Sequence, residues 1–343
     1  MQKYLSFTQV CNLIASVGHK RTIIVEGENG IGKTALFHAL KRMPKFANHI
    51  AVDPIDCTQL SDGSVWMPDL DRENGISREL PNERFGMSKS NQHGVNGSKP
   101  VLIMLDEIAK APQFIKNVLA PIVYERRVGA FHFVEGSVVF AGTNLSVEGL
   151  GDSIQAHLRN RLTFVKMRKP NADEWINWAA DAGVAPEVIA FVHMFPQVMD
   201  SFMDYEDGGK YHGKPLEKDN PYIFNPKKPQ AAFVSPRSLA TASNIVKTRK
   251  QNDSDSVIAA LSGAIGEAAA RDMQAYIEFS DQLPSWEDTI KDPKNTKVPT
   301  SPGACAIVVF SAVAQITTIA HAPGEVGTSV LVGFLVIASH VGN

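Results

Sequence analysis

The stretch GENGIGKT, from Gly27 to Thr34, follows the apolar run TIIVE and precedes a segment of helical character. Its pattern is G-x-x-x-x-G-K-[ST], in which the glycines let the backbone curl so that several N–H groups point at one anion. The following helix adds its positive N-terminal end at the same place. Because the pattern lies between a strand and a helix, it predicts a phosphate-binding loop rather than a chance glycine-rich turn.

Side chains at the end of this loop supply the more specific contacts. Lys33 would reach the β- and γ-phosphates of a nucleoside triphosphate, and the Thr34 hydroxyl would coordinate Mg²⁺. ATP and Mg²⁺ are therefore the expected cofactors. The predicted nucleotide-binding residues are Gly27, Glu28, Asn29, Gly30, Ile31, Gly32, Lys33, Thr34 and Ala35.

Two acidic residues end a second apolar run, VLIMLDE, which begins at Val101. Asp106 can hold Mg²⁺ through water, and Glu107 can polarise the water that attacks the γ-phosphate. A solvated strand end with no catalytic role is the alternative. The phosphate-binding loop in the same chain favours the catalytic interpretation.

A third apolar run, SVVFAGTN, ends in Asn144. The carboxyl ends of parallel strands meet at one edge of a sheet, where ligands bind, so this amide would lie near the loop and the acidic pair. Asn144 could orient the attacking water. The alternative is an asparagine that only caps loop backbone.

The apolar runs also predict the fold class. Those from Thr22, Val101, Ser137 and Leu162 are short and continuous, as in strands buried on both faces of a parallel sheet, and HIAVDPID is a weaker fifth candidate. Helical segments such as KTALFHALKRM and APQFIKNVLAPIVYERR separate them. This alternation predicts an α/β domain with a parallel sheet flanked by helices.

From about Pro170 onward the sequence is mainly helical in character, with a Gly-, Pro- and charge-rich loop over 205–230. We therefore predict an α/β domain over 1–169 and a helical domain over 170–290. A linker and an apolar C-terminal segment of unassigned role follow over 291–343. The apolar run SVLVGFLVIA (Ser329 to Ala338) is too short to span a bilayer as a helix.

Composition limits the possible classes of protein. The chain has 343 residues, a formal net charge of -2 and three cysteines, which is too few for a disulfide framework or a zinc pattern. No general electrostatic footprint for nucleic acid is expected, although a local basic groove is not excluded. The N-terminal segment has no apolar signal-peptide core, so we expect a cytoplasmic protein without membrane association. Motifs of serine or zinc hydrolases, such as G-x-S-x-G and H-E-x-x-H, are absent.

Phosphate loop, acidic pair and asparagine, each at a strand end and in this order, resemble the AAA+ ATPase superfamily. More narrowly, the chain resembles its MoxR-type and dynein-related branch, including bacteriophage-encoded versions, over residues 1–290. The segment 58–86 is similar to that branch's insert in helix 2, and 125–140 is similar to its pre-sensor hairpin. The resemblance implies a P-loop core with strand order 5-1-4-3-2, an α-helical lid domain and a bacterial cell as the setting.

The resemblance further implies a homo-oligomeric ring, usually a hexamer, with ATP at the subunit boundaries. AHLRNRLTFVKM resembles the arginine-finger region, in which Arg159 and Arg161 compete for the role and the motif favours Arg161. SPRSL resembles the sensor-2 motif, which assigns Arg237 to the phosphate from the lid. A helix-end salt bridge is the alternative for either finger candidate, and lid packing is the alternative for Arg237.

The energy of ATP can be used in three ways. A MoxR-like machine would remodel a protein partner, often one with a von Willebrand factor A domain, and we favour this function because no DNA-binding motif accompanies the core. A DNA-acting motor subunit and a slow ATP-dependent switch are the alternatives. An exposed Trp66-Met67 pair in the insert would grip a polypeptide at a ring's pore, unless Trp66 packs in the domain's own core.

Overall fold

The computed structural model describes residues 3–61, 63–145, 160–203, 210–211, 214–215, 220–225, 230–283 and 301–320. The chain forms two compact units, Met1–Lys169 and Pro170–Asn343, which are described separately below. The division falls at the residue where the sequence changes from mixed to mainly helical character.

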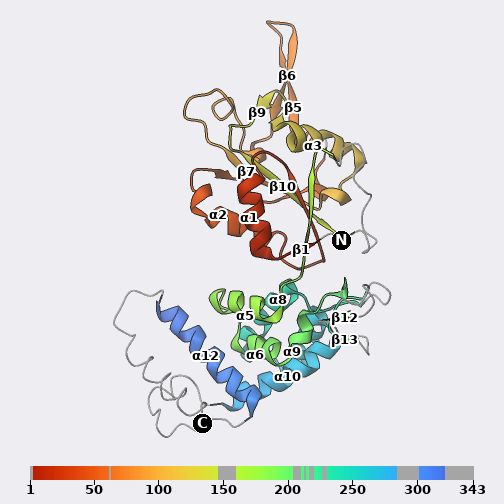
Figure 1. The fold of residues 1–343 in the computed structure, drawn as a ribbon, viewed down its shortest axis with the longest axis vertical. Coiled ribbons are helices and arrows are strands. Elements are labelled where there is room, and N and C mark those ends of the chain that lie inside the picture. Colours follow the sequence, from red (N-terminus) through yellow and green to blue (C-terminus); the bar gives the residue numbers. More distant parts are fainter. Residues whose placement is uncertain are drawn as a thin grey trace. The chain divides into compact units, whose positions relative to one another are not determined.

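The first unit is built on one parallel sheet (Figure 1). Its strand order is β1-β11-β2-β10-β7-β3, and β4 also pairs with β7. Without β1, the strands stand in the order fifth, first, fourth, third, second along the chain, so the predicted α/β class and strand order are confirmed. The strands are β1 (Tyr4–Leu5), β2 (Ile23–Gly27), β3 (Ile50–Ala51), β4 (Ile55–Asp56), β7 (Val101–Asp106), β10 (Val138–Asn144) and β11 (Thr163–Met167).

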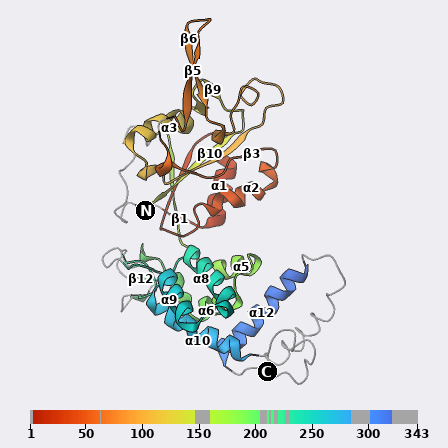
Figure 2. The same ribbon diagram turned by 180° about the vertical axis from the view of Figure 1, so that it is seen from behind.

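Burial on both faces explains why the strands are continuous apolar runs. In β7, Ile103 and Leu105 join one core cluster, while Leu102 and Met104 join the other. The first cluster lies against helix α3 (Gln113–Glu125), and the second lies against α1 (Phe7–Val17) and α2 (Ala35–Arg42). Figures 1 and 2 show α1 and α2 together on one side of the sheet and α3 on the other.

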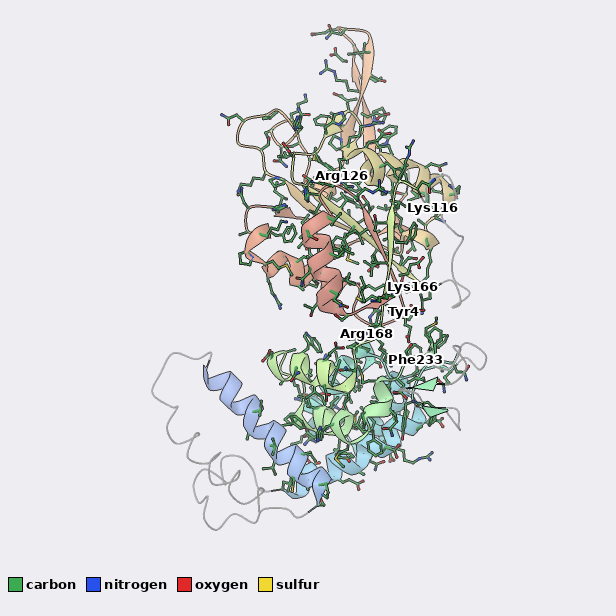
Figure 3. The ribbon with its side chains drawn as sticks, viewed as in Figure 1. Tyr4, Lys116, Arg126, Lys166, Arg168 and Phe233 are labelled. Atoms are coloured by element: carbon green, nitrogen blue, oxygen red, sulfur yellow. The ribbon has the colours of Figure 1, made fainter. Side chains whose placement is uncertain are left out.

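The edge strand β1 was not predicted. It is two residues long and pairs in parallel with β11, where Tyr4 stands opposite Lys166. The Lys166 ammonium lies 5.5 Å from the centroid of the Tyr4 ring, and both residues are labelled in Figure 3. A strand this short carries no periodic signal in the sequence.

Two hairpins interrupt the helices of this unit. Strands β5 (Trp66–Asp71) and β6 (Ile76–Pro81) form an antiparallel pair within the predicted insert, and Figures 1 and 2 show it projecting from the unit. Strands β8 (Arg127–Val128) and β9 (Phe131–His132) form the second hairpin, within the segment 125–140. Of the two positions left open for Trp66, the structure shows packing at the edge of the core, while the neighbouring Met67 is exposed.

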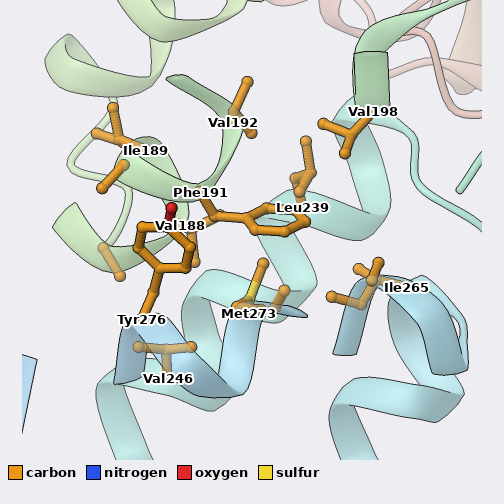
Figure 4. Close-up of a cluster of buried hydrophobic side chains, with 14 of the residues drawn as sticks. Val188, Ile189, Phe191, Val192, Val198, Leu239, Val246, Ile265, Met273 and Tyr276 are labelled. Carbon is orange, nitrogen blue, oxygen red and sulfur yellow. The ribbon is translucent and has the colours of Figure 1, made fainter. Parts of the chain in front are cut away.

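The second unit is helical around one core (Figure 4). Phe191, Leu239, Met273 and Tyr276 are central to it. Its helices are α5 (Ala172–Asp181), α6 (Pro186–Met194), α8 (Pro236–Thr248), α9 (Ser254–Ile265), α10 (Glu267–Gln282) and α12 (Pro302–Ala320). Short 3₁₀ turns in the two units are η1 (Pro44–Phe46), η2 (Cys57–Gln59), η3 (Glu83–Phe85), η4 (Ile108–Lys110), η6 (Pro196–Met199) and η7 (Arg249–Gln251).

Two details of the second unit were not predicted from the sequence. The helical segment that follows Asp253 is divided at Gly266, whose φ of 86° lies in the left-handed region that favours glycine. A Cβ there would lie 2.8 Å from the Ala232 carbonyl oxygen. Helix α12 begins inside the C-terminal part of unassigned role, and its Ile307 is buried in the core of this unit.

Parts of the long loop and the C-terminus complete the description. Strands β12 (Lys210–Tyr211) and β13 (Lys214–Pro215) form a short antiparallel pair within the loop predicted over 205–230. The apolar segment from Ser329 to Ala338 lies outside the described residues. Within the described part of the chain, no helix combines the length and apolar character needed to cross a membrane.

Candidate nucleotide-binding site

The phosphate-loop candidate connects β2 to α2, as predicted. Gly30 and Gly32 have φ angles of 74° and 99°, which side chains with a Cβ rarely adopt. Ile31 between them is buried and anchors the loop in the core. A Cβ at Gly27 would lie 2.5 Å from the Ile31 side chain, so the tight approach of loop to strand also requires glycine.

Lys33 is buried at the centre of the loop. Its ammonium donates hydrogen bonds to the carbonyl oxygens of Gly27 at 2.9 Å and Glu28 at 2.8 Å. A third bond, of 2.7 Å, goes to Oδ1 of Asn144. The loop therefore places a cation next to its own curled backbone, as an anion site requires. Glu28 is buried as well, whereas Ala35 is exposed at the start of α2.

Thr34 and Asp106 meet across the two neighbouring segments. The Thr34 hydroxyl donates a 2.8 Å hydrogen bond to Oδ2 of Asp106, and Oδ1 of Asp106 accepts from the Glu107 backbone N–H at 3.0 Å. A Cβ on Gly142 of β10 would lie 2.8 Å from that Oδ1. The glycine in the neighbouring strand thus leaves room for the carboxylate.

Glu107 has an unusual backbone conformation. Its φ of 54° lies in the left-handed region, which is costly for a residue with a side chain and is often found at functional sites. Its carboxylate accepts hydrogen bonds from Nδ2 of Asn144 at 3.0 and 3.3 Å. Asn144 therefore links Glu107 to Lys33 through the two ends of one amide.

Lys110 is a contact that the sequence interpretation missed. Its ammonium lies 3.1 Å from Oε2 of Glu107. The only sequence signal is the spacing of three residues after Glu107, which brings side chains together in a helical turn. Such spacings are too common to single out a lysine without the fold.

The parallel register explains why these side chains converge. Asn144 stands opposite Gly27 between β10 and β2, and Asp56 of β4 stands opposite Asp106 of β7. Every one of these residues lies at the carboxyl end of its strand, at the edge of the sheet where the loop begins. The structure thus brings the predicted loop, acidic pair and asparagine together.

Carboxylates lie around the buried thiol of Cys57 at this edge of the sheet. Burial raises the pKa of Cys57, and the carboxylates of Asp106, Asp56 and Glu107 raise it further. The thiol is therefore protonated and unreactive at neutral pH.

Two of the three predicted arginines, Arg161 and Arg237, lie in the part of the chain that the structure describes. Arg161 is exposed, and its guanidinium lies 5.8 Å from the centroid of the Tyr124 ring. Arg237 is exposed near the start of α8, in the second unit. Arg159 lies outside the described residues. Their assignment as fingers or sensor stays a prediction.

The arrangement fits ATP with Mg²⁺. Backbone N–H groups of a loop with two left-handed glycines, the Lys33 ammonium and the N-terminus of α2 suit phosphate oxygens. Within the described residues, no group of three or more His, Cys, Asp or Glu residues could hold a metal ion. A magnesium ion would therefore depend on Thr34, Asp106, phosphate oxygens and water, which is its usual way of binding in nucleotide sites.

Comparisons with known proteins give structural matches alone. No protein-family model and no curated protein sequence matches the chain. NtrX of Brucella abortus in complex with ADP is similar at 15% identity and a TM-score of 0.40, over 98% of this chain and 65% of that one. This chain therefore spans less than two thirds of the length of that NtrX chain.

Two further solved structures are similar at the same level. NtrX in complex with ATP matches at 14% identity and a TM-score of 0.39, over 100% of this chain and 68% of that one. A mutant of RuvB from Thermotoga maritima matches at 11% identity and a TM-score of 0.38, over 83% and 73%. At these identities the likeness concerns the fold alone, and the function is argued below from the site.

Proposed function

We propose that the chain is an ATPase of the AAA+ superfamily that binds ATP with Mg²⁺ at the loop between β2 and α2. One observation carries this proposal: Lys33, Asn144 and Glu107 form a hydrogen-bonded row beside the Thr34–Asp106 pair. All five lie at the carboxyl edge of a sheet ordered β11-β2-β10-β7-β3. Lys33 would bind the β- and γ-phosphates, and Thr34 and Asp106 would hold the metal ion, directly and through water respectively.

In this site Glu107 is the group that can take a proton from the attacking water. Asn144 fixes the position of that carboxylate and also contacts Lys33, so it can sense whether a phosphate occupies the loop. Mg²⁺, when bound, would neutralise charge on the phosphate oxygens.

The finer proposal is a MoxR-like ring, of hexameric size, that remodels a protein partner of the kind that carries a von Willebrand factor A domain. It is supported by the sequence resemblance and by the projecting β5–β6 hairpin, whose Met67, Leu70 and Ile76 side chains are exposed. In such a ring, Arg161 of one subunit would reach the γ-phosphate bound by the next, and Arg237 would reach it from the lid. We place this protein in the cytoplasm of a bacterial cell.

Turnover and particle mass test both levels of the proposal. Steady-state ATP hydrolysis should fall by roughly two to four orders of magnitude in Glu107→Gln, because a positioned general base contributes about that much, while ATP binding is retained. Loss of binding together with turnover would point to a folding defect. Unchanged turnover in Glu107→Gln would overturn the proposed role of this residue.

Mass photometry of Glu107→Gln with and without ATP tests the ring. We expect an ATP-dependent hexamer that Arg161→Ala weakens and that the exposed-surface control Arg84→Ala does not. A particle that binds ATP but stays monomeric or dimeric would contradict the ring for the isolated protein.

One observation favours the slow switch as a second candidate. The Glu107 carboxylate is engaged by both Asn144 and Lys110, which leaves fewer of its acceptor sites for polarising water. A low turnover at all protein concentrations that rises several-fold in Lys110→Ala would support the switch. A high turnover that depends on protein concentration would exclude it.

A further inference from the structure

The first 52 residues are positively charged, unlike the chain as a whole. They contain seven Lys and Arg residues and two acidic residues, 7 minus 2 giving +5, although the whole chain has a net charge of -2. The two acidic residues, Glu26 and Glu28, lie in β2 and in the phosphate loop, and Glu28 is buried. Exposed charge in this segment is therefore positive.

Three of these seven residues, together with His38, lie on α2 and on the short turn η1 that follows it. His38, Lys41 and Arg42 follow the i, i+3, i+4 spacing of one face of α2, Lys45 lies in η1 after the extended Met43, and all four are exposed. Leu36, Phe37 and Leu40 on the other side of α2 are buried in the core. The core therefore fixes which way the basic side of α2 faces.

The end of α1 extends this set. The Lys45 ammonium donates to the carbonyl oxygen of Ala15 in α1, which ties the two helix ends together. Lys20 and Arg21, just after α1, are also exposed. Figures 1 and 2 both show α1 and α2 side by side. We call the set His38, Lys41, Arg42, Lys45, Lys20 and Arg21 the basic face.

The negative ends of the helices do not explain why so many cations gather in the basic face. A helix C-terminus carries roughly half a negative charge, which a single cation offsets, whereas five Lys and Arg residues gather at the ends of two helices. Among the described residues, one acidic side chain can be placed near the basic face. It is the exposed Glu135, next to Gly136, whose carbonyl oxygen lies 3.2 Å from Nε2 of His49.

We propose that the basic face binds the phosphate backbone of double-stranded nucleic acid without reading its sequence. The helical part of the basic face, from His38 to Arg42, is about 6 Å long at 1.5 Å per residue, and a duplex presents one charge per about 1.7 Å of its axis. Roughly four phosphate charges therefore lie within reach of this helical part, and Lys45, Lys20 and Arg21 extend the face beyond it. This surface is separate from the proposed ATP site and does not depend on its function.

The composition of the basic face favours nucleic acid over other anionic partners. Protein interfaces are depleted in lysine and carry aromatic anchors, whereas interfaces with nucleic acid are polar and strongly positive. A membrane surface would be met by apolar side chains beside the cations, but the apolar side of α2 is buried. Binding to anionic lipids is therefore the competing outcome of the test.

The test uses the full chain, a fluorescent 30-base-pair duplex of mixed sequence and anisotropy at several salt concentrations. The test variant is Lys20→Gln, Lys41→Gln, Arg42→Gln, in which three exposed cations of the basic face are neutralised. The control variant, Arg84→Gln, Lys89→Gln, Lys250→Gln, removes the same charge from exposed positions outside it. A Lys33→Ala chain, measured alongside, separates this binding from the ATP site.

We expect the test variant to bind at least about tenfold more weakly, with the slope of log affinity against log salt reduced by about 2.7, because each lost phosphate contact removes about 0.9. The control variant and Lys33→Ala should match the parent chain. Glu135→Gln should bind slightly more tightly.

Equal loss in the test and control variants would show a nonspecific charge effect and overturn the proposal. Absence of duplex binding at 50 mM salt would overturn it as well. Binding to vesicles containing phosphatidylserine that depends on the basic face, without duplex binding, would assign the face to a membrane instead.

Discussion

Helix α2 in the first unit and helices α8 and α9 in the second begin in opposite ways. At the start of α2 the side chain of Thr34 makes no capping hydrogen bond and instead contacts Asp106. At the starts of α8 and α9, Ser235 and Asp253 accept hydrogen bonds from the N–H groups of Ser238 and Ser256. N–H groups in the first turns of α8 and α9 are thus bound by capping side chains, whereas the capping residue of α2 contacts a carboxylate instead.

The difference separates a binding site from a stabilising feature. Exposed N–H groups at a helix start leave a partial positive charge that a phosphate can satisfy, and a side-chain cap removes that capacity. Changes at the start of α2 should therefore reduce nucleotide binding or turnover, while changes at α8 and α9 should reduce stability alone. The predictions below test this contrast.

Removing the loop cation should have the largest effect. Lys33→Ala should weaken ATP binding by at least about 100-fold, because a charge-assisted contact to phosphate is lost, equivalent to about 2.7 kcal/mol. Titration with a fluorescent ATP analogue measures this loss. Lys41→Ala, an exposed change later in the same helix, is the control and should leave the affinity unchanged. Equal affinity in Lys33→Ala and the parent would refute the assignment of the loop.

Removing the Thr34 hydroxyl should have a smaller effect that depends on the metal. Thr34→Ala should reduce turnover by roughly tenfold at limiting Mg²⁺, because one oxygen ligand is lost, and Thr34→Ser should restore it because the hydroxyl returns. A magnesium titration of turnover distinguishes the three chains. If alanine and serine behave alike, the hydroxyl does not hold the metal.

The same contrast shows what could be predicted from the sequence. The phosphate loop, Asp106, Glu107 and Asn144 were identified because each is a short local pattern at the end of an apolar run, and a parallel sheet necessarily brings such ends together. The strand order followed from the family resemblance and was confirmed. Lys110 was missed because its role depends on the left-handed turn at Glu107, which no residue-type preference indicates.

Other differences have equally local causes. Gly266 separates α9 from α10 because its positive φ and the nearby Ala232 carbonyl oxygen require a residue without a side chain, whereas isolated glycines also occur inside helices. The polar sequence around Trp66 left open whether this side chain is exposed or packs in the core. Its actual position is set by residues distant in the sequence, such as Val128 and Phe133 in the same core cluster.

Opening the cap of α8 should cost stability and leave nucleotide binding intact. Ser235 and Ser238 form a reciprocal capping box, and Ser235 is buried. Ser235→Ala should lower the free energy of unfolding of the second unit by about 1 kcal/mol, as measured by urea denaturation. Thr241→Ala, on the exposed side of the same helix, is the control. A loss of ATP affinity in Ser235→Ala, without loss of stability, would contradict the expectation that the start of α8 only stabilises the fold.

The cap of α9 should give the smallest effect, and one that depends on pH. The pKa of Asp253 is lowered from its usual 3.8, first by the backbone N–H of Ser256 and then by its hydroxyl. A carboxylate with a lowered pKa contributes stability above its unfolded pKa and loses that contribution as the pH falls through its folded pKa. The melting temperature of Asp253→Asn should therefore lie slightly below that of the parent at pH 7, and the gap should close below pH 3.8. Asp255→Asn, in the first turn of the same helix, is the control for a general charge effect. A gap that is the same at both pH values would show that the carboxylate does not act as a charged cap.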